Sequence, residues 1–73
     1  MTQLIWESKL DKIYQCEVNR IDEYKGILKV TNTENHFVLL EQEVTLSYRS
    51  LFGPDVDDVA YWQDLSVQAV DNQ

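Results

Sequence analysis

Cysteine, histidine, proline and glycine are scarce in this chain of 73 residues, and the scarcity excludes several classes of protein. A single cysteine cannot form an internal disulfide, which favours a reducing compartment. One cysteine and one histidine are too few for a structural zinc site, which usually takes four such ligands. Two glycines leave no glycine-rich loop to hold a phosphate or a dinucleotide.

Long apolar runs and positive charge are also missing. No run approaches the ~20 apolar residues that span a bilayer, and the N-terminus lacks the basic and apolar blocks of a signal peptide. We therefore expect a cytoplasmic protein with no membrane contact. Six basic residues face thirteen acidic ones, giving a net charge of −7, whereas direct nucleic-acid binding needs a basic patch. The charge favours a partner with a basic protein surface, although acidic residues also keep small domains soluble.

Apolar and aromatic residues are well represented and predict a folded chain. Hydrophobic residues make up 44% of the sequence, and two Trp, four Tyr and two Phe supply large side chains for a core. The length suits one small domain over residues 1–73. Alternating segments come first and a segment with helical spacing comes last, an order typical of the α+β class.

Three segments alternate apolar and polar residues, as half-buried strands do. Residues 13–21 and 24–31 form the first two, and the polar stretch 32–35 predicts a hairpin loop before the third, which begins near His36. Short connections favour an antiparallel meander of three to four strands. Gly26 predicts a bulge or a close approach of backbone. Residues 4–6 are apolar and suit either an edge strand or a terminal segment over the core.

The third segment does not keep one simple alternation. Residues 37–40 are apolar on both parities, and keeping the parity of Val38 would place Gln42 on the buried face. A bulge near residues 41–43 would relieve that conflict. The segment is long enough for one bent strand or two short ones.

Gly53-Pro54 is the strongest break in the sequence, and helical spacing follows it. Asp55 is a good N-cap, and Asp57 and Asp58 then fall in the first turn, where the helix dipole favours negative charge. We predict a helix over residues 56–69 packed on one face of the sheet, with residues 71–73 frayed. Its buried face is predicted to contain Val56, Val59, Ala60, Val67 and Val70, with Trp62, Leu65 and Ala69 at one side.

The residues that could carry chemistry have structural explanations. Cys16 falls at an apolar strand position and His36 at a hairpin end, so nothing in their spacing makes a nucleophile–base pair. The aspartates at 55, 57 and 58 lack the glycine turn of a calcium loop, and helix capping explains them. Glu41 and Glu43 could serve acid–base catalysis with another carboxylate, but two exposed carboxylates on a strand are ordinary. We expect no enzyme activity, no cofactor and no metal.

The end of the chain suggests a docking surface. Residues from Ser50 onward include five aspartates and no Lys or Arg, so local ion pairing does not explain them. Tyr61 and Trp62 are neighbours on the helix and point about 100° apart. If Trp62 fills the core, Tyr61 lies at the rim beside the aspartates; alternatively, both rings only cover the sheet edge. The predicted partner-binding residues are Asp55, Asp57, Asp58, Tyr61, Asp64, Glu41 and Glu43.

Four features together suggest a family: the small size, the acidic excess, the strand-rich N-terminal part, and the block FGPDVDDVAYWQ at residues 52–63. In these the chain resembles the small phage-encoded inhibitors of bacterial RNA polymerase, of the type found in a Xanthomonas phage. The resemblance implies a non-enzymatic protein that docks on the polymerase and blocks initiation or alters elongation. It transfers no individual functional residue.

Three functions remain open at this point. The first is regulation of a host bacterial RNA polymerase, acting in the host cytoplasm. The second is an acidic inhibitor that mimics nucleic acid and occupies another DNA-handling protein. The third is a structural phage protein or a small oligomeric subunit. The sequence leaves open the docking site, the step blocked and the oligomeric state.

Overall fold

The computed structural model describes residues 5–47 and 54–72. Leu4 and Gly53, which entered the predictions above, lie outside this part of the chain. The described residues form four strands in one antiparallel sheet of order β1-β2-β3-β4, followed by one helix, which confirms the predicted α+β meander. The elements are β1 (Ile5–Lys9), β2 (Tyr14–Arg20), β3 (Lys25–Asn32), β4 (Phe37–Thr45) and α1 (Val56–Asp71).

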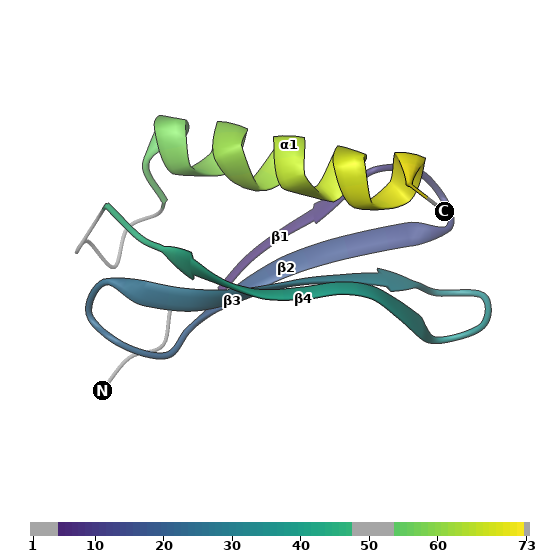
Figure 1. Ribbon diagram of the computed structural model, residues 1–73, viewed down its shortest axis with the longest axis horizontal. Coiled ribbons are helices and arrows are strands. Elements are labelled where there is room, and N and C mark those ends of the chain that lie inside the picture. The colour runs from purple at the N-terminus through teal and green to yellow at the C-terminus, as the bar shows by residue number, and fades with distance from the viewer. Residues whose placement is uncertain (1–4, 48–53, 73) are drawn as a thin grey trace.

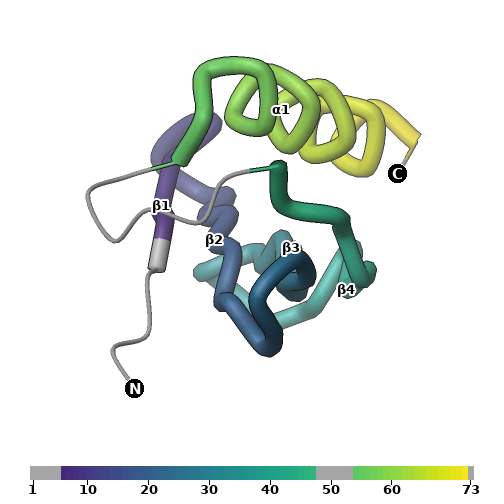
Figure 2. Tube along the Cα trace, turned by 90° about the vertical axis from the view of Figure 1, so that its left-hand side faces the viewer, coloured from purple at the N-terminus to yellow at the C-terminus, as the bar shows by residue number. Residues whose placement is uncertain are grey.

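The molecule has two layers, with α1 lying across one face of the sheet (Figure 1). Figure 2 shows the same arrangement from the end, with the helix above the strands. The core lies between the layers, and Trp62 is the fully buried apolar residue that α1 contributes to it. The sheet and Leu46, which follows directly after β4, supply the remaining buried apolar side chains: Cys16, Val18, Leu28, Val30, Val44 and Leu46.

Strand parity decides which side chains enter this core. Cys16 pairs with Val30 and Val18 with Leu28 in the β2–β3 register, so all four point to the helix side. Cys16 is buried, as its position in the alternation predicts, and its Sγ donates a hydrogen bond to the Ser8 carbonyl oxygen at 3.0 Å. The N-terminal apolar segment resolves as the edge strand β1.

The predicted bulge in the third segment is present but displaced. The register of β3 with β4 shifts between Val30 and Thr31, where Val30 pairs with Leu40 and Thr31 with Val38. Leu39 is therefore the extra residue, and the bulge lies before residues 41–43, not within them. β4 remains one strand, and Gln42 keeps the helix-side parity but is exposed on the edge strand.

The helix begins as predicted and ends later. Asp55 is the N-cap, with φ −66° and ψ 145°, and its carboxylate accepts a hydrogen bond from the Asp57 N–H at 3.1 Å. The expected fraying is wrong for Asp71 and Asn72, because α1 continues through Asp71 and the Asn72 N–H donates to the Gln68 and Val70 carbonyl oxygens. Gln73, the last residue of that prediction, lies outside the described part of the chain. No helix among the described residues has the length and apolar character needed to cross a membrane.

The predicted rotation of the helix is wrong. Trp62 is 0% exposed and marks the centre of the buried face, whereas Val56 is 81% exposed. Ala60 and Val67 are exposed too, and Val59, Leu65 and Val70 are partly buried against the core. The buried polar residues explain the difference. Asp58 and Ser66 lie one turn before and after Trp62, and each is buried with a hydrogen bond.

Gly26 meets the neighbouring strand closely, one of the two alternatives predicted for it. A Cβ at this position would lie 2.9 Å from the Asn19 carbonyl oxygen and 3.1 Å from Val18 Cγ1. Because a backbone atom is the nearest neighbour, the strands must move apart to accept a side chain. We expect Gly26→Ala to lower the free energy of unfolding by about 1–2 kcal/mol, measured by urea denaturation. An unchanged midpoint would contradict this packing.

Candidate functional site

The outward face of α1 carries a line of exposed aspartates. Asp57, Asp64 and Asp71 are spaced by seven residues, which is close to two helical turns, and Tyr61 lies among them with 50% of its surface exposed. We call Asp57, Tyr61, Asp64 and Asp71 the acidic stripe. The three aspartates of the stripe lie opposite Trp62 on the helix and point away from the sheet, whereas Tyr61 lies about 100° from Trp62, at the side of the helix.

Exposed apolar side chains lie beside the acidic stripe. Val56, Ala60 and Val67 follow one another at spacings of four and seven residues on the adjoining part of the outward face. Val67 is 45% exposed, and Val56 is more exposed still. Apolar and aromatic side chains bordered by charge are typical of protein–protein contacts. The valines that were wrongly predicted to be core therefore extend the candidate docking surface.

Helix energetics account for only part of the acidic stripe. Asp57 lies in the first turn, where the dipole stabilises negative charge. Asp64 lies mid-helix, and Asp71 lies in the last turn, which contains no basic residue. A carboxylate at a helix C-terminus is unfavourable by about 0.3–1 kcal/mol. Helix stability therefore does not explain Asp71 or Asp64, unlike Asp57.

Asp58 does not belong to this surface, which corrects its predicted role in partner binding. Its side chain is buried, at 9% exposure, and its two carboxylate oxygens accept hydrogen bonds from Ser47. The Ser47 Oγ donates at 2.8 Å and the Ser47 N–H at 3.0 Å. Asp58 therefore fastens the first turn of α1 to the residues that follow β4. Asp55, also predicted to bind, is exposed but has its carboxylate engaged as the helix cap.

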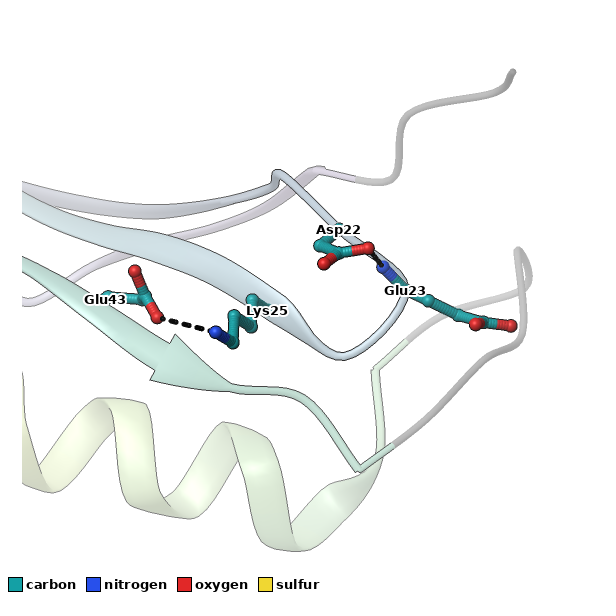
Figure 3. A network of polar contacts seen from close by, with 4 residues as sticks. All are labelled: Asp22, Glu23, Lys25 and Glu43. Atoms are coloured by element: carbon teal, nitrogen blue, oxygen red, sulfur yellow. Dashed lines mark hydrogen bonds and ion pairs between the residues drawn. The ribbon is translucent and has the colours of Figure 1, made fainter.

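Glu41 and Glu43 lie on a different side of the molecule. Both alternate with the buried Val44, so their side chains point to the sheet face that the helix leaves open. The Glu43 carboxylate forms an ion pair with Lys25 Nζ at 3.5 Å, and both side chains are more than half exposed. Figure 3 shows this pair beside the Asp22–Glu23 turn. The predicted residues thus divide into two surfaces, one on α1 and one on the sheet.

A shallow cavity of about 270 Å³ opens on the same sheet face. Its volume is just below the roughly 300–1,000 Å³ of typical small-molecule sites. His36 borders it in a left-handed conformation, with φ 60°, at the end of the β3–β4 hairpin. Cys16 points to the other face and does not meet His36. This cavity was not predicted from the sequence, because its lining depends on the conformation of the β3–β4 hairpin. The cavity is lined by Gln15, Glu17, Lys29, Thr31, Thr33 and His36.

No metal site emerges from residues 5–47 and 54–72, since they contain no group of three His, Cys, Asp or Glu side chains placed to hold an ion. Comparisons of the chain with protein families, with curated proteins and with solved structures each find no significant match. The geometry of the surfaces therefore carries the functional argument.

Proposed function

We propose that this protein is a small, non-enzymatic regulator that binds a basic surface of a host bacterial RNA polymerase through the acidic stripe and inhibits or redirects transcription. The observation that carries the proposal is the outward face of α1. It combines exposed apolar side chains with aspartates that no basic residue of the helix accompanies. The resemblance to phage-encoded polymerase inhibitors supplies the identity of the partner and the cytoplasmic setting.

Charge density favours docking on a protein over mimicry of nucleic acid. Aspartates seven residues apart on a helix are separated by ~10.5 Å along its axis. Double-stranded DNA carries one charge per ~1.7 Å of its axis. The acidic stripe is thus far less charged than the molecule it would mimic, and apolar groups lie beside it. A basic protein patch with an apolar centre matches it better.

Neutralising the stripe tests the proposal. We expect Asp57→Asn combined with Asp64→Asn to lower the association rate with purified bacterial RNA polymerase by roughly tenfold at low salt, because both charges steer the encounter. Binding kinetics on immobilised polymerase measure the effect. Asp58 is unsuitable for this experiment, because its carboxylate supports the fold.

A matched control removes two negative charges elsewhere. Glu17 lies on the open sheet face and Glu34 in the β3–β4 hairpin, both away from α1. Glu17→Gln combined with Glu34→Gln should leave the association rate within about twofold of the wild type. If both double variants lowered the association rate equally, net charge alone would explain the effect, and docking through α1 would be contradicted. Circular dichroism confirms that each variant is folded.

A further inference from the structure

The outer edge of β4 presents backbone groups that the sheet does not use. The Leu46 N–H donates to the Tyr24 carbonyl oxygen at 2.8 Å, so these two residues form a hydrogen-bonded pair. Hydrogen-bonded pairs alternate along an antiparallel ladder. The backbone groups of Gln42 and Val44 therefore point to β3, and those of Glu41, Glu43 and Thr45 point outward.

The opposite side of β3 agrees with this assignment. The Ile21 N–H donates to the Lys25 carbonyl oxygen at 2.9 Å, which directs the backbone groups of Lys25, Ile27 and Lys29 toward β2. The backbone groups of the intervening β3 residues, Gly26 and Leu28, then point toward β4. Within the described part of the chain, β4 is the last strand of the sheet and pairs with β3 alone.

From β2 to β4, directly opposite side chains alternate in charge up to this edge, whereas Glu7 of β1 lies opposite Glu17 with the same sign of charge. Glu17 of β2 is opposite Lys29 of β3, and Lys29 is opposite Glu41 of β4. A cation on the next strand would continue the alternation, because directly opposite side chains of unlike charge stabilise a sheet. Glu43 lies two residues further on the same face, and its ion pair with Lys25 is exposed and therefore weak.

We propose that the β4 edge binds an extended basic segment of a partner protein, which adds a fifth strand to the sheet. The backbone of Glu41 and Glu43 hydrogen-bonds to the segment, and their carboxylates meet basic side chains at alternate positions of it. This mode of binding takes its affinity from main-chain hydrogen bonds and its specificity from alternate side chains. The inference goes beyond the proposed function, because it concerns a surface separate from the acidic stripe.

A second copy of this chain is a poor occupant of the edge. Antiparallel pairing of two β4 edges around residues 41–43 would place Glu41 and Glu43 of one copy opposite those of the other. Like charges directly opposite one another destabilise a sheet, and charged edge strands are a recognised means of preventing such self-pairing. The same charges attract a basic strand, which makes charge the basis of selection at this edge.

Peptides that alternate lysine and threonine test the proposal. A lysine opposite Glu41 or Glu43 uses its own backbone N–H in the ladder, whereas the intervening threonine directs its N–H away. We expect N-methylation of the lysines to abolish binding to the wild-type protein, and N-methylation of the threonines to leave it nearly unchanged. Isothermal titration measures both affinities. Equal binding of the two methylated peptides would reduce the interaction to unspecific charge attraction and overturn the proposal.

Variants of the chain give a second, independent readout. Glu41→Gln with Glu43→Gln should weaken binding of the unmethylated peptide by roughly tenfold, the sum of two exposed charge pairs. Glu7→Gln with Glu34→Gln changes the net charge equally, on the opposite edge strand β1 and in the β3–β4 hairpin, and should change the affinity by less than about twofold. Equal losses in the two double variants would contradict the assigned edge.

Amide hydrogen exchange locates the bound strand. In the free protein the outward amides of Glu41, Glu43 and Thr45 should exchange faster than those of Gln42 and Val44. The peptide should slow exchange at the three outward amides only. Slowed exchange at these amides without peptide, together with a dimer in sedimentation, would identify a second copy as the occupant and overturn the proposal.

Discussion

Replacing Trp62 with alanine is expected to lower the free energy of unfolding by about 3–5 kcal/mol, the range for large aromatic side chains in a core. Trp62 is fully buried, and its ring lies against that of Trp6 with centroids 5.1 Å apart and planes tilted by 52°. It joins the helix to both β1 and the centre of the sheet. A small domain holds only about 5–15 kcal/mol in total, so the variant should lose a large share of its stability and unfold at a much lower denaturant concentration than the wild type.

Tyr61 is the matched control for this substitution. It is an aromatic residue on the same helix, adjacent in sequence, and half of its surface is exposed. We expect Tyr61→Ala to change stability by less than about 1 kcal/mol, with both variants measured by chemical denaturation. Equal destabilisation by the two substitutions would show that the rotation of α1 described above is incorrect.

Asp58→Ala is expected to lower the free energy of unfolding by about 1.5–3 kcal/mol. The substitution removes two hydrogen bonds to a charged acceptor and leaves the Ser47 N–H and hydroxyl without this partner. Asp57→Ala, in the same turn but exposed, should cost only the dipole contribution of about 0.3–1 kcal/mol.

A double-mutant cycle separates the Asp58–Ser47 contact from other effects of the substitution. Ser47→Ala should destabilise the wild type by losing its hydroxyl bond, yet have much less effect in the Asp58→Ala background. Additive losses in the cycle would mean that the two side chains do not interact. Thermal unfolding of the four proteins provides the comparison.

The alternation of apolar and polar residues predicted the sheet well, because alternate side chains of a strand point to opposite faces and only one face is covered by the helix. Cys16, Val18, Leu28 and Val30 all occupy the core on the predicted parity. The displaced bulge shows the limit of this reasoning. With residues 37–40 apolar on both parities, no contrast marks where the alternation changes, and the register with β3 decides it.

The start of the helix followed from local chemistry, but its end and its rotation did not. Pro54 and the Asp55 cap fix the start through groups adjacent in sequence. The rotation depends on Asp58 and Ser66, which are polar and yet buried. The Ser66 hydroxyl donates to the Trp62 carbonyl oxygen at 2.8 Å within the helix, and Asp58 bonds to Ser47 eleven residues away. A prediction based only on the positions of apolar residues places Asp58 and Ser66 on the exposed face, and therefore assigns the wrong face of α1 to the core.

The candidate site was predicted in part. Asp57, Tyr61 and Asp64 lie together on the exposed face of α1, while Asp58 is buried and Glu41 and Glu43 lie on the far side of the sheet. The alternation along β4 could have shown that the two glutamates lie on the sheet face away from the helix. Their side chains point to the face opposite to that of Val44, and the helix packs on the face of Val44. The exposure of Val56 and Val67 could not be anticipated without the rotation of α1.

Binding of the wild-type protein to purified bacterial RNA polymerase across a series of salt concentrations tests the central claim most directly. Docking of an acidic stripe on a basic surface predicts binding that weakens steadily as salt rises, mainly through a slower association rate. The apolar neighbours of the stripe should preserve a measurable complex at physiological salt. Absence of binding at low salt would contradict the polymerase as partner, and an affinity independent of salt would contradict the acidic stripe as the docking surface.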